Sequence, residues 1–217
     1  MRSSRVIACL AIAVLVATTA QATPITVYNT GVDGGGAALA DNAVDSHWTL
    51  SGTGAADTQG PDAIVATSAG GFPIGPWMGD SATSAWITPA EDTNGPGATD
   101  GTANYLYTTT FTTPGDGQVA FSGQQSADNG VVAFDVDGIA GTYTPVGFNA
   151  WASFDILVDV TGTDHTLTFT VHNGTGEANP DGPAGFRAEF NRADYVPEPG
   201  ALALLAIGGL ALLRRRR

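Results

Sequence analysis

Apolar and polar residues alternate along much of the middle of this chain, and this pattern restricts the fold more than any other sequence feature. The clearest run is Thr166–Val171, in which three threonines alternate with leucine, phenylalanine and valine. A period of two is typical of a β-strand with one buried face, whereas an amphipathic helix needs apolar residues three or four apart. No long stretch of the body shows helical spacing, so the sequence predicts an all-β domain.

Similar runs recur between turn signals such as Asp137-Gly138 and Asn173-Gly174. Shorter and less regular strands are expected in the first third of the body, at 25–28, 48–50, 63–66 and 85–87. Roughly nine or ten strands over residues 23–195 predict an antiparallel β-sandwich of jelly-roll type. The alternating runs cover 105–111, 119–121, 132–136, 154–160, 166–171 and 186–190.

The body contains far more acidic than basic residues. Between residues 23 and 196 there are twenty acidic residues against Arg187 and Arg192, a net charge of −18, and the chain has no lysine. Such a body repels phosphate backbones, which excludes nucleic acid as a partner. The single cysteine, Cys9, lies in the leading apolar segment, so the body has neither internal disulfides nor a thiol nucleophile.

The first 22 residues have the three parts of a secretory signal peptide. Two arginines precede an apolar run at 6–17, and the small-residue sequence Ala20-Gln21-Ala22 follows. We therefore expect export through the secretion translocase and cleavage by signal peptidase between Ala22 and Thr23.

The last 22 residues form a second targeting segment. After Val196, Pro197, Glu198 and Pro199 comes an apolar run at 201–213, about 20 Å long as a helix. A bilayer core is about 30 Å thick, so this run predicts a short, strained span that anchors the protein in the inner membrane only transiently. The positive-inside rule keeps the terminal cluster cytoplasmic and the acidic body outside. That cluster is Arg214, Arg215, Arg216 and Arg217.

This tail resembles the PEP-CTERM protein-sorting signal of Gram-negative bacteria, which is also known as the C-terminal domain of certain ice-binding proteins. The motif, the apolar helix and the arginine block occur in the family's order over 196–217. The resemblance implies recognition by an exosortase, a membrane cysteine transpeptidase that cuts near the motif and passes the body to the cell surface or beyond. Glu198 would then be a recognition residue.

The body is similar to galactose-binding-type jelly rolls found in exported proteins with this tail. The likeness is a pattern of core and turn residues, and it supports the fold rather than a ligand. It is carried by the segments at 45–48, 84–87, 105–111, 127–130, 166–173 and 185–190.

No catalytic motif is evident. His47, His165 and His172 have no metal-ligand spacing and are expected at turns or on the surface, and no serine has an evident base partner. We therefore predict that the protein is not an enzyme, although its many carboxylates leave a carbohydrate-active hydrolase as an alternative. No metal site or cofactor is predicted. Asp135-Val136-Asp137-Gly138 admits Ca²⁺, but a hairpin turn explains the same residues.

Two of the four tryptophans are candidates for ligand binding. Trp48 and Trp86 stand beside predicted strands and are expected in the core, whereas Trp77 and Trp151 stand in segments expected to be loops, the first at the surface. Flat aromatic rings stack on sugar faces when hydrogen-bonding groups lie nearby.

Asp128 and Asn129 complete the candidate ligand-binding set. The interpretation that follows is an exported surface protein, non-catalytic, that binds extracellular polysaccharide or serves as a structural component beside it. An ice-binding surface protein is a further alternative. Threonine runs such as 108–110 favour it, but the sequence shows no flat repeating array.

Overall fold

The computed structural model describes residues 21–72, 77–91, 93–96, 103–174 and 181–198. In these ranges the chain forms antiparallel strands and two single 3₁₀ turns, at Gly54–Ala56 and Ser68–Gly70, and no α-helix. The prediction of an all-β, jelly-roll-type sandwich is confirmed.

The strands vary in length from two to thirteen residues. In chain order they are β1 (Thr23–Pro24), β2 (Val44–Thr53), β3 (Asp62–Ala66), β4 (Trp86–Thr88), β5 (Asn94–Pro96), β6 (Asn104–Thr112), β7 (Gly117–Asp128), β8 (Gly130–Val136), β9 (Ile139–Ala140), β10 (Thr142–Tyr143), β11 (Ala152–Val160), β12 (Asp164–His172), β13 (Asp181–Pro183) and β14 (Gly185–Pro197).

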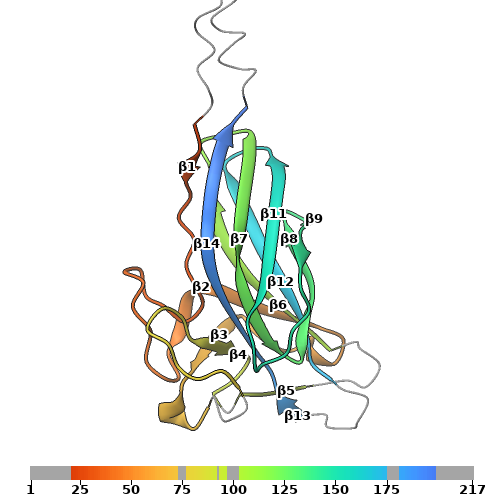
Figure 1. Cartoon of the computed structure of the whole chain (residues 1–217). Coiled ribbons are helices and arrows are strands. Elements are labelled where there is room, and N and C mark those ends of the chain that lie inside the picture. Colours follow the sequence, from red (N-terminus) through yellow and green to blue (C-terminus); the bar gives the residue numbers. More distant parts are fainter. Residues whose placement is uncertain (1–20, 73–76, 92, 97–102, 175–180, 199–217) are drawn as a thin grey trace, which may run out of the picture.

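One sheet of twelve strands folds over on itself to make the sandwich. Its order is β10-β11-β7-β14-β4-β3-β2-β6-β12-β8-β9, with β1 added beside β14; β5 and β13 form a separate pair. Figure 1 shows β11, β7 and β14 as one layer and β2, β6, β12 and β8 as the layer behind it. The short strands β4 and β3 connect the two layers on one side, and β9 and β10 lie between β8 and β11 on the other.

The alternation seen in the sequence matches the burial of most long strands. In β12 the residues Leu167, Phe169 and Val171 are buried, and the threonines between them face outward. In β8 it fails at Val132, which was expected on the buried face but is exposed, while Val131 is buried, because the pairing with β12 shifts between Thr170 and Val171. The first third deviates from expectation, because no strand forms at 25–28. The strand lies at Thr23–Pro24 instead, and beyond it one backbone bond from Ile25 to the carbonyl of Ala193 continues the pairing at 2.9 Å.

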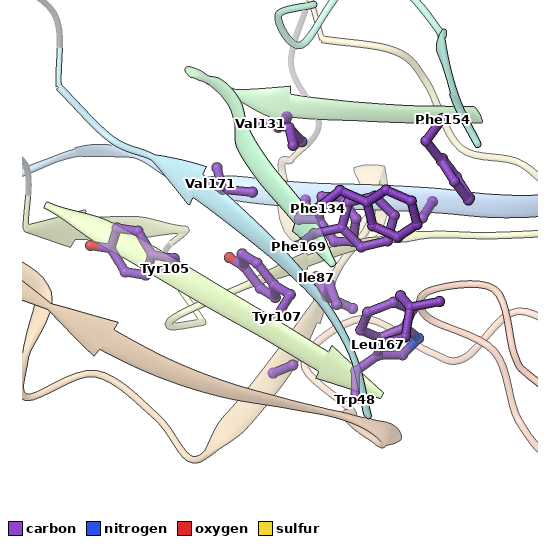
Figure 2. Close-up of a cluster of buried hydrophobic side chains, with 14 of the residues drawn as sticks. Trp48, Ile87, Tyr105, Tyr107, Val131, Phe134, Phe154, Leu167, Phe169 and Val171 are labelled. Atoms are coloured by element: carbon purple, nitrogen blue, oxygen red, sulfur yellow. The ribbon is translucent and has the colours of Figure 1, made fainter. Parts of the chain in front are cut away.

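The core between the layers is aromatic. The Phe169 ring centroid lies 4.5 Å from that of Phe134, 5.0 Å from that of Phe154 and 4.8 Å from that of Phe186, so rings of β8, β11, β12 and β14 pack together. Figure 2 shows Phe134, Phe154 and Phe169 in this cluster. Each buried phenylalanine contributes about 1.5–3 kcal/mol, and paired rings add about 0.5–1.5 kcal/mol. This packing holds the two layers together.

The two ends of the sandwich are called poles below. β14 runs from Gly185, opposite Asp128 of β7, to Pro197, opposite Gly117. At about 3.3 Å per residue the twelve residues of β7 separate the poles by roughly 36 Å. The sorting pole comprises β1, the end of β14 and the turns at 113–116, 137–138 and 161–164. The far pole comprises 77–80, 128–129, 147–151 and 184–187.

Candidate functional site

The sorting pole brings together the two places where the sequence predicts processing. β1 begins at Thr23, directly after the expected leader cleavage bond, and pairs antiparallel with the last part of β14. Thr23 lies opposite Tyr195 and Pro24 opposite Asp194. The start of the body and the sorting motif are therefore neighbours, as the adjacent ends of β1 and β14 in Figure 1 show.

The sorting motif begins inside the sheet. Val196 lies opposite Gln118 and Pro197 opposite Gly117, so β14 runs two residues past the body boundary expected at Tyr195. Proline has no backbone N–H and cannot continue a ladder, which accounts for the end of the strand at Pro197. Glu198 follows and is exposed. Pro199 and the rest of the tail, including the arginines at 214–217, lie outside the described residues.

Tyr195 fixes the body side of the motif. Its ring is buried, and its hydroxyl donates to the backbone oxygen of Asp116 at 2.9 Å. A Cβ at Gly117 would lie 2.5 Å from this ring, so the ring packs where only glycine leaves room. Tyr195 also borders a cavity of about 430 Å³ whose other walls are 23–26 and 112–114.

A polar network under the same pole corrects one prediction. His165 is 3% exposed, not on the surface. Its Nδ1 lies 2.7 Å from Asp137 Oδ2, and its Nε2 lies 3.0 Å from Thr113 Oγ1. The Thr113 hydroxyl also contacts the carbonyls of Gly115 and Gly162 at 3.0 and 3.1 Å. The network thus connects three turns of the sorting pole.

The carboxylate of this network is held in its charged form. Burial raises the pKa of Asp137, but hydrogen bonds from the Thr166 backbone, from His165 and from the Thr166 hydroxyl outweigh it, and the pKa lies below its usual range. The carboxylate of Asp135 accepts the Gly138 N–H at 2.9 Å and so closes the hairpin from β8 to β9. No group of three or more potential metal ligands occurs in the part of the chain that the structure describes.

The far pole contains the predicted ligand-binding residues, with a different arrangement from the one expected. Trp77 is 8% exposed, so the expectation of a surface ring is wrong. Its Nε1 donates to Asp128 Oδ2 at 3.0 Å, and its ring centroid lies 4.4 Å from that of Trp86. Burial raises the pKa of Asp128 to about 6, although the bond from Trp77 opposes the shift. The Asn129 side chain accepts the Gly174 N–H at 2.8 Å.

Trp151 is the candidate that keeps a partly exposed ring, and it covers a residue that sequence reasoning missed. Arg187 is 2% exposed, and its guanidinium carbon lies 5.1 Å from the centre of the Trp151 ring. The guanidinium donates to Ser84 Oγ, to the Ser84 carbonyl and to the Gly79 carbonyl at 2.7–3.1 Å. The sequence does contain a signal for a buried arginine: Arg187 is the one basic residue within the alternating run at 186–190.

A hydroxyl-bearing surface, called the threonine face, covers the outside of β2, β6 and β12. The sheet register aligns Thr49 with Thr108 and Thr168 in one row and Thr110 with Thr166 in the next. The Thr108 and Thr168 hydroxyls are 3.1 Å apart. Neighbouring rows are about 6.7 Å apart and neighbouring strands about 4.8 Å. The face consists of Thr49, Ser51, Thr108, Thr110, Thr166, Thr168 and Thr170, and Leu106 lies on it between Ser51 and Thr170.

Comparisons with known proteins support the tail more than the body. Residues 196–217 match the PEP-CTERM protein-sorting motif. No curated protein matches the chain. A Paenibacillus sp. cycloisomaltooligosaccharide glucanotransferase, solved with cycloisomaltoheptaose, is similar over 72% of this chain and 18% of its own, with 14% identity and a TM-score of 0.31. That likeness is too weak to carry an argument.

No helix within the described ranges is long and apolar enough to cross a membrane, and the predicted span at 201–213 lies outside those ranges. The matched motif implies export by the general secretion machinery, processing by an exosortase, and a location at the cell surface or outside the cell. The chain therefore carries a PEP-CTERM sorting signal on an exported all-β body.

Proposed function

We propose that the body is a non-catalytic surface component that binds neutral extracellular polysaccharide through the threonine face. The carrying observation is that hydroxyls align across three strands in the middle of this face, where the row Thr49–Thr108–Thr168 meets charge only at its two ends, at Asp62 of β3 and Asp135 of β8. The tail provides a membrane anchor that exosortase processing makes temporary, so the body is finally presented outside the cell.

Hydroxyl rows suit a neutral polyol for two physical reasons. Threonine is β-branched and stiff at χ1, so little rotamer freedom is lost when its hydroxyl binds. Single hydrogen bonds contribute only about 0.5–1.5 kcal/mol each, so a repeating polymer that engages several rows gains where a single sugar does not. Anionic polymers are disfavoured by the acidic body.

Catalysis receives no support from the network at the sorting pole. Asp137, His165 and Thr113 are connected in the order of a hydrolase triad. However, Thr113 is buried and its hydroxyl already contacts two carbonyls, which competes with donation to His165. We propose that this network holds the turns of the sorting pole together. The hydrolase alternative is tested directly, by measuring whether sugars are released from the polymer.

Binding is tested with the purified body, residues 23–198, in pull-down with insoluble neutral polysaccharides. T108E/T168E places two charges at the centre of the face and is expected to abolish retention. L157E adds charge on the opposite layer, where Leu157 is exposed, and is expected to bind like wild type. W151A tests the far pole. Retention lost in W151A but not in T108E/T168E, or release of sugars from the polymer, would contradict the proposal.

Ice is the second candidate occupant of the same face. In its favour, the register aligns five threonines across strands in two rows, Thr49–Thr108–Thr168 and Thr110–Thr166. Stiff hydroxyl and methyl rows can order water in a plane. Inhibition of ice recrystallisation by the purified body, abolished by T108E/T168E and kept by L157E, would favour ice; no inhibition in wild type would exclude it.

A further inference from the structure

The border of the layer formed by β11, β7 and β14 is only half covered by a neighbouring strand. β11 pairs with β7 along its whole length, but on its other side β10 pairs with it only at Phe154 and Asp155. One further backbone bond joins the Thr144 N–H to the Ser153 carbonyl at 2.8 Å. No strand of the described residues pairs with 157–160 on this side, where β11 borders the layer in Figure 1.

The free backbone groups of this border belong to Leu157 and Asp159. In an antiparallel strand the N–H and C=O of one residue point to the same side, and neighbouring residues alternate. The Ser153 carbonyl accepts a bond from the β10 side, and the register with β7 has no shift, so the groups of Leu157 and Asp159 also point away from β7. At about 3.3 Å per residue, 157–160 leave about 13 Å of unpaired edge.

The outer side chains along this border are two acids with a leucine between them. Asp155, Leu157 and Asp159 are exposed, and Leu157 has 60% of its surface exposed. The Asp159 carboxylate accepts a bond from Gln118 Nε2 at 3.2 Å. In the part of the chain that the structure describes, neither acid has an ion-pair partner. The edge therefore offers an apolar contact flanked by two negative charges.

This pattern disfavours a second copy of the chain as the occupant. An antiparallel pairing of two copies over 157–160 places Asp159 opposite either Leu157 or the other Asp159. Like charges directly opposite each other destabilise a strand pair, and an acid opposite a leucine gains nothing from its charge. The net charge of −18 on each body adds repulsion. A strand with a basic residue opposite Asp159 and an apolar residue opposite Leu157 meets neither obstacle.

We propose that the free edge at 157–160 docks an extended basic segment of another protein outside the cell, which adds to the sheet as a strand beside β11. A basic side chain pairs with Asp159, and an apolar side chain covers Leu157. A second basic side chain, just beyond the paired stretch, reaches Asp155, whose backbone is already bonded to β10.

Proteins usually protect an exposed edge with a bulge, a proline, a covering segment or charged side chains. The free half of β11 has no bulge and no proline, and its leucine is uncovered. Its acids repel acidic strands and attract basic ones, so the edge selects its partner by charge. The site lies on the layer opposite the threonine face, so the inference does not depend on what that face binds.

Binding is measured by fluorescence anisotropy at 0.15 M salt, with residues 23–198, which contain every described strand, and labelled Ac-TKTVTKT-NH2. A body with a charge of −18 attracts any basic peptide, so the control is Ac-TKTPTKT-NH2. This peptide has the same charge, but its proline lacks the N–H that would donate to Leu157. The valine peptide is expected to bind at least tenfold more tightly. Equal affinity for the two peptides, or binding of neither, would overturn the proposal.

Variants place the peptide on β11. L157P removes an N–H that points off the edge and leaves the bonds to β7 in place, and it is expected to weaken binding at least tenfold. D155K/D159K should weaken binding by at least as much. D57K/D62K is the matched control, because it makes the same change of charge at exposed acids outside β11, and it should stay within about threefold of wild type. Equal losses in the two double variants would contradict the proposal.

Hydrogen exchange tests the geometry in the unmodified protein, so its result does not depend on whether L157P folds. The amides of Leu157 and Asp159 are expected to exchange at least tenfold faster than those of Ile156 and Val158, which point to β7. Saturation with the valine peptide should slow the first pair at least tenfold. Leu157 and Asp159 amides that are protected in the free body, or that stay unprotected in the complex, would refute a free edge that accepts a strand.

Discussion

At the sorting pole the chain is held by hydrogen bonds between side chains and turns, whereas at the far pole it is held by a cluster of aromatic rings and by one buried arginine. Tyr195, Thr113 and His165 each bond to a neighbouring turn or side chain at the sorting pole. At the far pole Trp77 packs against Trp86 and buries Asp128.

The two kinds of contact respond differently when one residue is changed. A net contribution of about 0.5–1.5 kcal/mol per hydrogen bond lets the sorting pole rearrange locally when one contact is lost. A packed aromatic cluster fails as a unit, because truncation leaves a cavity. We therefore expect a single substitution to cost less stability at the sorting pole than at the far pole.

Truncation of Trp77 should give the largest effect. W77A removes a buried ring and leaves the Asp128 carboxyl without its donor. We expect the free energy of unfolding to fall by about 3–5 kcal/mol, measured by urea denaturation. W151A is the matched control. Its free energy of unfolding should fall by less than half as much, because the Trp151 side chain is only partly buried. Equal losses would contradict the described packing of the far pole.

Removal of the Thr113 hydroxyl should give an intermediate effect at the sorting pole. T113V keeps the shape of the side chain but leaves buried His165 Nε2 without its partner, at a loss of about 1–3 kcal/mol. T170V, on the threonine face, is the control and should change stability by no more than about 0.5 kcal/mol. A T113V protein as stable as T170V would show that the network does not hold the turns together.

Lowering the pH should change the contributions of Asp128 at the far pole and Asp137 at the sorting pole to folding stability in opposite directions. Burial raises the pKa of folded Asp128 to about 6, above the usual aspartate value of about 3.9, so folding favours its protonated form. Stability should therefore rise as the pH falls from about 6 toward 4, and this gain is lost as the pH rises through 6. Asp137 has a lowered pKa, so its contribution is present above about pH 4 and is lost in stronger acid.

The measurement is the unfolding free energy of wild type, D128N and D137N between pH 3 and pH 7. D128N should remove about 1–2 kcal/mol of the change between pH 4 and 6. D137N should flatten the curve only below about pH 4. Burial also raises the pKa of Asp45, so the difference between wild type and D128N, not the wild-type slope, isolates the far pole. Identical slopes in these two proteins would be inconsistent with a buried, shifted Asp128.

Salt should give the smallest effect and act on both poles alike. The body carries −18, and screening shortens the range of its self-repulsion from about 30 Å at 0.01 M to about 8 Å at 0.15 M salt. We expect the melting temperature to rise by a few degrees with added sodium chloride. An unchanged melting temperature would show that the acids are too dispersed to repel one another measurably.

The sequence predicts the fold well where burial is one-sided. In β6, β11 and β12 the alternating residues reveal which side is buried, because a strand with one face inward has a period of two. The matched sorting motif was equally legible, since its residues are contiguous in the chain.

The arrangement of the poles could not be predicted, because it depends on contacts between distant segments. His165 is buried by Asp137 and Thr113, which are 28 and 52 residues away. Trp77 stands in a Gly/Pro-rich loop, and only the fold supplies Asp128 as a buried acceptor for its N–H. The threonine face could not be predicted, because it depends on the register of β6 against β12, which a single sequence does not specify.

The length of β14 has a mechanical consequence. A body tethered through Pro197 and pulled at its far pole is loaded along β14, parallel to the strand axis. The hydrogen bonds to β7 lie across that axis from Gly185 to Pro197, so they resist the pull together instead of opening one after another. Tension from a surface attachment would thus be spread over the whole strand, while β1, paired with it over two residues, carries almost none.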